Sequence, residues 1–262
     1  MNTLIRHCLV ALLLCASFVS RAEDPAPIAV DGTRVWHVSD ELQIKQLAPD
    51  LWEHTSWHLL DGNRPYPANG LIVRDGDSIT LIDTAWGVEP TRQLIDWIDA
   101  TLKLPITHVI PTHFHDDRIG GWPELDVRDI PLAQSPKTRE LAAGKQISAP
   151  HDPVLDDLKQ GQAVPVGAVE VFSPGPGHSP DNLVVWLPQY QLLFGGCMIK
   201  SISAAAMGNV ADADPVQWPQ SIRNIQARYP QIRSVIPGHF ESGGPELLDH
   251  TLTLLKHTAR SH

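Results

Sequence analysis

The sequence predicts an α/β protein of four layers, an αβ/βα sandwich in which two β-sheets pack face to face and helices cover the outside. The 262-residue chain is 42% hydrophobic and 19% charged, which suits one large domain with a sizeable core. In each half, apolar segments typical of strands are followed by a segment with the apolar spacing of a helix. Because sheets and helices each bury an apolar face, two such halves are expected to pack sheet against sheet. No repeat or flexible linker separates them, so we expect a single domain over residues 41–262.

Strand and helix signals follow one another along the first half. Residues 42–86 have β composition, and residues 71–83 contain two apolar runs joined by Asp-Gly-Asp, a hairpin signal. Pro90 is expected to open a helix, because proline suits the first helical turn. A short buried strand over residues 106–113 then leads into a histidine-rich loop, and a second helix is expected near residues 137–143. The apolar positions that share one face of the first helix are Leu94, Ile95, Ile98 and Leu102.

The second half repeats this order. Asp214 and Pro215 are the residue types of a helix N-cap and of a first-turn proline. Residues 233–239 form a predicted strand that ends in a histidine. Further strands are expected at residues 164–172, 183–187 and 191–194, with a turn at residues 188–190. Two helical stripes comprise Trp218, Ile222, Ile225 and Tyr229, and, in a C-terminal helix, Leu248, Leu252 and Leu255.

The N-terminus has the pattern of an export signal. Arg6 and His7 precede an apolar run over residues 8–19, and the small-x-small sequence that ends at Ala22 predicts cleavage there. The mature protein is therefore expected in the periplasm, with residues 23–40 as an extended, proline-rich leader. No later stretch is long and apolar enough to span a membrane.

Charge and cysteine content restrict the possible partners. The formal net charge of −10 argues against binding of nucleic acid or of an anionic membrane surface. Cys8 and Cys15 would leave with the signal, so the mature chain keeps Cys197 alone. A single thiol cannot form an internal disulfide, and taken by itself Cys197 is either a buried apolar residue or a functional one.

One short motif carries most of the chemistry. His113, His115 and Asp117 follow a predicted strand at alternating positions, where two imidazoles and a carboxylate can converge on a metal. Zinc takes such nitrogen and oxygen ligands, usually four per ion. Ordinary surface or core histidines are the alternative interpretation of this motif alone.

Three further motifs end predicted strands, and each supplies one donor. They are Pro-Gly-His-Ser, which contains His178, Gly-Gly-Cys, which ends at Cys197, and Pro-Gly-His, which ends at His239. Their glycines permit sharp turns and close backbone approach. Together with the first motif they give six donors, which are too many for one tetrahedral zinc. Six donors suit two ions that each keep an open position for water.

The set H-F-H-D-D-R, P-G-H-S, G-G-C-M-I-K and P-G-H resembles the metallo-β-lactamases, in particular their subclass B1, from Leu42 to the C-terminus. The second subclass has Asn in place of His113. The third has His in place of Arg118 and lacks a ligand like Cys197. The resemblance implies that His113, His115 and His178 hold one Zn²⁺ and that Asp117, Cys197 and His239 hold a second.

The implied activity is zinc-dependent hydrolysis of the β-lactam amide of penicillins, cephalosporins and carbapenems, which confers antibiotic resistance. On this interpretation a metal-bound hydroxide attacks the lactam carbonyl, the second zinc accepts the departing ring nitrogen, and no acyl-enzyme forms. Asp117 and Asn209 are the candidate catalytic residues. Asn209 matches a family asparagine that can donate to the carbonyl, and an ordinary turn residue after glycine is the alternative interpretation.

Other residues resemble the family's substrate contacts. Lys200 matches the lysine that binds the β-lactam carboxylate, and Trp86 matches an apolar wall of the cleft. Residues 61–70 match a mobile loop that closes over the substrate, and Tyr66 of this loop could stack on an apolar substituent. A surface lysine, a core tryptophan and an ordinary loop residue are the alternatives. Asp83, at the end of a predicted strand, is expected to accept hydrogen bonds behind the site.

Two other functions stay open. One is a thioesterase-like or lactonase-like hydrolase of the same fold, against which Cys197 and Lys200 argue. The other is a non-catalytic periplasmic zinc-binding protein, which would need closed metal coordination. The expected partner is a small-molecule β-lactam, and we expect a monomer.

Overall fold

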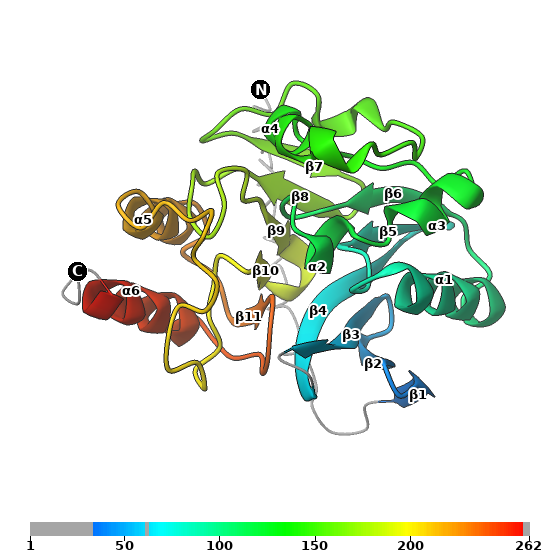
Figure 1. Cartoon of the computed structure of the whole chain (residues 1–262), viewed down its shortest axis with the longest axis horizontal. Helices are drawn as coiled ribbons and strands as arrows, with labels where there is room; N and C mark the ends of the chain where they lie inside the picture. Colours follow the sequence, from blue (N-terminus) through cyan, green and yellow to red (C-terminus); the bar gives the residue numbers. More distant parts are fainter. Residues whose placement is uncertain (1–33, 61–62, 259–262) are drawn as a thin grey trace, which may run out of the picture.

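Two sheets form the centre of the molecule. The computed structural model describes residues 34–60 and 63–258, so the predicted signal and the leader up to residue 33 lie outside the described residues. The first sheet has the order β1-β2-β3-β4-β5-β6 and the second the order β11-β10-β9-β8-β7. Figure 1 shows α1 (Val88–Thr101) and α3 (Trp122–Val127) outside one sheet, and α5 (Trp218–Arg228) and α6 (Glu246–Thr258) outside the other. The predicted four-layer sandwich is confirmed.

The first sheet is an antiparallel meander with one parallel strand at its edge. The α1 helix crosses from β5 to the parallel β6, and it begins at Val88, two residues before the predicted proline. The hairpin predicted within residues 71–83 is present, with Gly76 at φ 58° between β4 and β5. The six strands are β1 (Val35–Ser39), β2 (Leu42–Ala48), β3 (Leu51–Leu60), β4 (Arg64–Asp75), β5 (Ser78–Ile82) and β6 (Ile106–Ile110).

Two expectations for the first half need correction. Residues 35–39, assigned to the leader, form β1 and pair with β2, so the folded domain includes them. The predicted loop over residues 61–70 is mostly strand, because β4 pairs with β3 from Arg64 onward. β5 pairs with β4 only from Leu71 onward, and the prolines of this segment come before Leu71. Their missing N–H groups therefore remove no hydrogen bond between β4 and β5.

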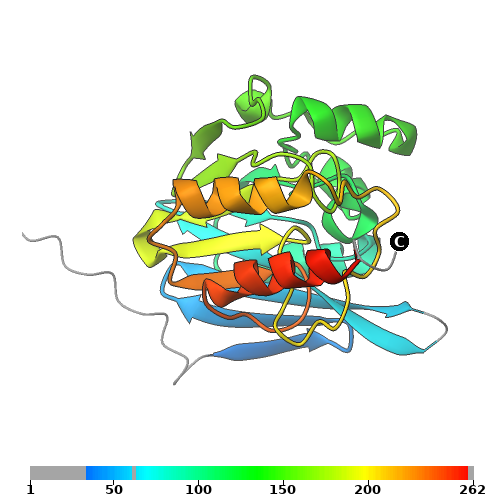
Figure 2. The same cartoon turned by 90° about the vertical axis from the view of Figure 1, so that its left-hand side faces the viewer.

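The second sheet has the same plan, with three antiparallel strands and a parallel pair, β10 and β11, at one edge. The strand predicted over residues 164–172 is two strands, because Gly167 at φ 55° turns the chain back on itself. Figure 2 views α5 and α6 from outside, side by side over this sheet. The strands are β7 (Ala163–Val166), β8 (Val169–Phe172), β9 (Val184–Leu187), β10 (Leu192–Gly196) and β11 (Ser234–Pro237).

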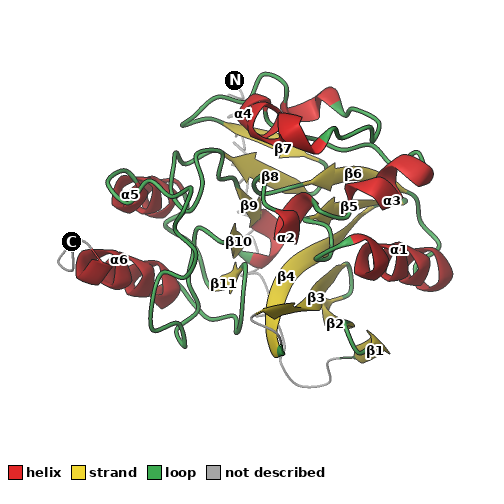
Figure 3. Cartoon of the chain, in the orientation of Figure 1, coloured by secondary structure: helices red, strands yellow, loops and turns green. Residues whose placement is uncertain are grey.

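The shorter helices lie in the connections, as Figure 3 shows. They are α2 (Asp116–Ile119), α4 (Pro136–Leu141) and the 3₁₀ turns η1 (Ala142–Lys145), η2 (Pro153–Leu155) and η3 (Pro188–Tyr190). The helix expected near residues 137–143 is thus α4 followed by η1. Asp214 accepts hydrogen bonds from the N–H groups of Val216 and Gln217, and α5 proper begins just after that turn.

The apolar core has three parts, as a four-layer structure requires. Leu71 and Ile82 of the first sheet pack with Val171 and Phe194 of the second, between the sheets. A second cluster joins the first sheet to α1, and a third joins the second sheet to α5 and α6. In the part of the chain that the structure describes, no helix is long and apolar enough to cross a bilayer.

Candidate metal centre and cavity

The predicted metal donors meet at one edge of the two sheets. Residues 111–117 follow β6, Cys197 follows β10, and His239 follows β11. His178 comes from the connection between β8 and β9. β6 in the first sheet and β10 and β11 in the second are parallel strands, and the donor segments follow their carboxyl ends. In α/β folds, ligands usually bind at the carboxyl ends of such strands.

Three imidazoles form the first group of donors. His115 Nδ1 lies 3.0 Å from His113 Nε2 and 3.1 Å from His178 Nε2. Burial and the neighbouring His178 hold the pKa of His113 well below its usual value, and burial with Lys200 lowers the pKa of His178 to about 2. His113 and His178 are therefore neutral and can turn lone pairs toward one point, as zinc ligands must.

A thiol, a carboxylate and an imidazole form the second group. Cys197 Sγ lies 3.1 Å from His239 Nε2 and 3.4 Å from Asp117 Oδ2, and the last two atoms are 3.2 Å apart. Burial raises the pKa of the Cys197 thiol far above its usual value. A buried thiolate therefore needs a cation beside it, and a metal ion supplies one.

Both groups fit zinc. Zinc bonds to nitrogen are about 2.0–2.1 Å long, so neighbouring nitrogens of a tetrahedral site are about 3.3 Å apart. The observed separations of the imidazole nitrogens are close to this value. Donor atoms of His113, His178 and Cys197 also lie within 4.8 Å of one another, so the two groups are neighbours.

A buried arginine supports both groups from behind. Arg118 is fully buried and forms ion pairs with Asp83 and Asp117, and its Nη2 donates to the Gly238 carbonyl at 2.8 Å. Burial opposes ionisation of Asp117, but Arg118 and His239 hold the pKa of its carboxyl well below its usual range. The structure also places Asp83 where the sequence suggested, because it accepts from the N–H of Thr112 at 2.6 Å, one residue before His113.

An open cavity of about 600 Å³ lies over these donors. Lys200 and Asn209 line it from the second half of the chain, and Tyr66 and Trp86 line it from the first. Asn209 is exposed, and its Oδ1 accepts from the N–H of Ala211 at 3.1 Å. The Tyr66 ring meets His239 edge-on, with the ring centroids 4.9 Å apart. The cavity thus brings together every residue that the sequence suggested as a substrate contact.

Two residues of this region were missed by the sequence analysis. Asp212 Oδ2 lies 2.9 Å from His115 Nε2, the ring nitrogen that does not face the other imidazoles. His58 stacks on Trp86 with ring centroids 4.8 Å apart and also lines the cavity. His58 comes from β3 and Asp212 from a long loop, and neither follows a recognisable motif, so only the folded chain reveals their neighbours.

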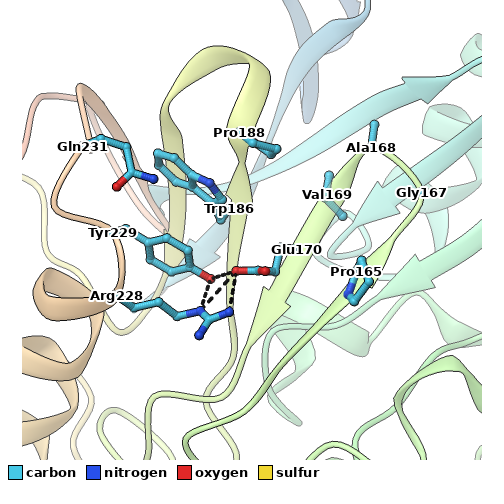
Figure 4. A pocket seen from close by; sticks show the side chains of 10 residues that line it. All are labelled: Pro165, Gly167, Ala168, Val169, Glu170, Trp186, Pro188, Arg228, Tyr229 and Gln231. Atoms are coloured by element: carbon cyan, nitrogen blue, oxygen red, sulfur yellow. Dashed lines mark hydrogen bonds and ion pairs between the residues drawn. The ribbon is translucent and has the colours of Figure 1, made fainter.

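A second hollow, of about 490 Å³, lies at the other end of the second sheet (Figure 4). Its charged groups are already paired, because Glu170 Oε1 accepts from the Tyr229 hydroxyl at 2.6 Å and from Arg228 Nε at 3.1 Å. Tyr229 also stacks on Trp186. These contacts fasten β8 to the end of α5, and we assign no ligand to this hollow.

The four-layer fold and its donors at the strand ends define a class, the metal-dependent hydrolases of the αβ/βα sandwich. The model of the metallo-β-lactamase superfamily matches residues 63–239. A type 2 metallo-β-lactamase from Bacillus cereus is 40% identical over 97% of this chain and 99% of its own length, and one from Bacteroides fragilis is 34% identical over 86% and 90%.

Solved structures agree with these sequence matches. A metallo-β-lactamase from Pontibacter korlensis is 39% identical with a TM-score of 0.76, covering 82% of this chain and 99% of its own. One from Pseudomonas aeruginosa, described as a mono-zinc form, is 33% identical with a TM-score of 0.77, covering 83% and 96%. The chain therefore belongs to the metallo-β-lactamase superfamily and is a hydrolase of the metallo-β-lactamase type.

Proposed function

We propose that this hydrolase opens the β-lactam ring of penicillins, cephalosporins and carbapenems with two zinc ions, as a member of subclass B1, and so confers antibiotic resistance. The observation that carries the proposal is the arrangement of two neighbouring three-donor groups beneath one cavity, which Lys200 and Asn209 line.

The donor sets differ in the charge that they bring to a metal. His113, His115 and His178 would hold one ion with neutral nitrogens, and Asp117, Cys197 and His239 would hold the other with two anionic ligands. Zinc in these positions supplies Lewis acidity and activates a water molecule for attack at neutral pH. Arg118 would fix the orientation of Asp117 through its ion pair with the carboxylate, and Asp212 would fix that of His115, because it contacts the ring nitrogen that faces away from the other imidazoles.

The cavity walls would orient the substrate. A bicyclic β-lactam carries a carboxylate on the ring fused to the lactam, and Lys200 is the cation that would bind it. Asn209 lines the same wall and has a side-chain N–H group that could donate to the lactam carbonyl. Tyr66 and Trp86 offer aromatic surfaces to apolar parts of the substrate. Trp86 is stacked on His58, and Tyr66 meets His239 edge-on.

Water rather than a side chain is the proposed nucleophile. Among the described residues that line the cavity, none has a serine or threonine hydroxyl, and Cys197 is buried among the metal donors. Direct attack by water forms no covalent ester with the enzyme. Mass spectrometry of the protein quenched during turnover should therefore find the unmodified chain, and a stable acyl adduct would overturn this part of the proposal.

Initial rates test the activity directly. The purified protein should hydrolyse a penicillin, a chromogenic cephalosporin and a carbapenem, with about two zinc ions per chain by metal analysis. EDTA should abolish the activity, and zinc should restore it, whereas clavulanate, which traps serine enzymes, should have no effect. Turnover of thioesters or lactones without turnover of β-lactams would favour the related hydrolases, and no metal-dependent turnover would favour a zinc-binding protein.

We also propose export to the periplasm with cleavage after Ala22, supported by the signal pattern at the N-terminus. Osmotic-shock fractionation and N-terminal sequencing of the released protein test it. Retention of residues 1–22 in the cytoplasmic fraction would contradict it. We expect the released protein to elute as a monomer in size-exclusion chromatography.

A further inference from the structure

The ammonium group of Lys200 has a neighbour outside the wall of the cavity. Its Nζ lies 5.4 Å from the centroid of the Trp218 ring, within the range of a cation–π interaction. Trp218 is the first residue of α5 and is fully buried, and it is not among the residues that line the cavity. The lysine side chain therefore rests on an aromatic group supplied by the outer helix layer.

Trp218 itself is held on two further sides. Its indole N–H donates to the carbonyl of Met198 at 2.9 Å, and its ring meets the His178 imidazole edge-on at a centroid distance of 6.0 Å. Trp218 also belongs, with Ile222 and Ile225, to the apolar core under α5 and α6. A ring fixed in this way presents one constant surface to Lys200.

The backbone of Lys200 is fixed by the other outer helix. Its N–H donates to Thr251 Oγ1 at 2.9 Å, and the Thr251 hydroxyl donates to the Leu247 carbonyl at 2.7 Å. Thr251 lies in α6 and is fully buried. Lys200 is therefore held at its amide by α6 and at its ammonium by α5.

We propose that Trp218 and Thr251 are positioning residues that hold Lys200 ready for the substrate carboxylate. The inference rests on the proposed function, in which Lys200 binds that carboxylate. A free lysine side chain has many rotamers, so holding it in one place before binding lowers the entropy cost of binding. Neither residue touches the substrate cavity, and their effect would pass through Lys200.

A matched pair of substrates tests this proposal, namely benzylpenicillin and its methyl ester, which lacks the carboxylate charge. Trp218→Leu should raise KM for the acid about five- to thirtyfold, the loss expected for a buried cation–π contact, and should change KM for the ester less than twofold. Trp218→Phe keeps an aromatic face, so its KM for the acid should lie between those of Trp218→Leu and the wild type. When Lys200 is already replaced by alanine, adding Trp218→Leu should raise KM for the acid little further.

Thr251 provides a second pair of variants if Trp218→Leu does not fold. Thr251→Val has nearly the same shape but cannot accept from the Lys200 N–H, and it should raise KM for the acid selectively, whereas Thr251→Ser keeps the acceptor and should resemble the wild type. Trp97→Leu, which removes a buried indole from α1 on the opposite side of the molecule, should leave the acid-to-ester ratio unchanged. Zinc content should match the wild type in every variant.

The outcomes separate this inference from the function on which it rests. If Lys200→Ala leaves KM for benzylpenicillin unchanged, the proposed role of Lys200 fails, and the inference fails with it. If Lys200→Ala raises KM but the Trp218 and Thr251 variants affect acid and ester equally, or lose zinc, the inference alone is overturned.

Discussion

Several side chains of the candidate metal centre are unfavourable in a buried environment unless a cation lies beside them. Cys197 is almost fully buried, burial raises the pKa of its thiol, and it lies against the carboxylate of Asp117. His113 and His178 are buried with their Nε2 atoms crowded against His115 Nδ1, at 3.0 Å and 3.1 Å. Groups of this kind cost free energy in an apolar core, so a bound ion accounts for their presence better than packing does.

Cys197→Ser tests this account at one atom. A neutral hydroxyl is a weaker zinc ligand than a thiolate, so zinc content should fall from about two to about one ion per chain when the metal is limiting. Hydrolysis of a chromogenic cephalosporin should then drop by at least about tenfold, and excess zinc should restore part of it. Metal analysis after gel filtration provides the measurement. Unchanged zinc content together with an unchanged rate would show that Cys197 is not a ligand.

At the scale of elements, the site depends on turns that bring strand ends into close contact. A Cβ atom at Gly238 would lie 2.7 Å from the Cys197 amide nitrogen and 2.8 Å from Arg118 Nη2. Gly196, just before Cys197, has φ 52°, in the region that favours glycine. The glycines of the two strand-end motifs thus allow β10 and β11 to place Cys197 and His239 3.1 Å apart.

Gly238→Ala should therefore separate these two donors. The atoms in the way are backbone and a buried guanidinium, which cannot move aside cheaply. We expect zinc affinity to fall by at least about tenfold while the protein stays folded. Gly144→Ala is the matched control, because nothing lies within 4 Å of a Cβ atom there and its φ is not positive. Competition with a chromophoric chelator measures the zinc affinity of each variant. Equal zinc affinity of Gly238→Ala and Gly144→Ala would contradict the argument.

The sequence predicted elements well where one local signal dominates. The Asp-Gly-Asp turn and the apolar stripe of α1 are examples, and the six side chains that the strand-end motifs suggested as metal donors lie close together in the fold. The sequence-based prediction was wrong where pairing with a neighbouring strand determines the secondary structure. Residues 64–70 contain two prolines and an asparagine, yet pairing with β3 makes them strand. Contacts such as Lys200 on Trp218 join segments whose approach no local pattern encodes.

Strand β3 also carries a buried acid that links the stability of the fold to pH. Burial raises the pKa of Glu53 to about 7, although Lys45 and Ser242 oppose the shift. The neutral form is favoured in the fold, so the contribution of Glu53 to stability is highest below pH 4.5 and falls as the pH rises to about 7. Glu53→Gln should therefore match the wild type in acid and exceed it by up to about 3 kcal/mol above pH 7.

Urea unfolding of the metal-free protein at several pH values measures this difference. Chelation beforehand is required because acid also releases metal from histidine ligands. Glu140→Gln, at an exposed position of α4, is the control and should show no such trend. A constant difference between Glu53→Gln and the wild type from pH 4 to pH 8 would contradict the raised pKa.

At the scale of the whole molecule, the candidate metal centre takes its donors from both halves of the chain. His113, His115 and Asp117 follow the first sheet, whereas His178, Cys197 and His239 belong to the second, so each group of three donors contains residues from both. The sheets also share the apolar layer that contains Leu71 and Phe194. Metal binding should therefore stabilise the packing of one half on the other, and not only the local loops.

Removal of metal should consequently destabilise the entire fold in one transition. A ligand that binds only the native state at a thousand times its Kd adds about 4 kcal/mol, which for a domain of this size corresponds to roughly 10 °C in Tm. We expect EDTA to lower the Tm of the wild type by about that amount and zinc to restore it. Cys197→Ser should show a smaller shift, because it holds one site less firmly. Differential scanning calorimetry tests the prediction. Two separate transitions after chelation, or a Tm that does not change with zinc, would mean that the two halves are held together by their apolar layer alone.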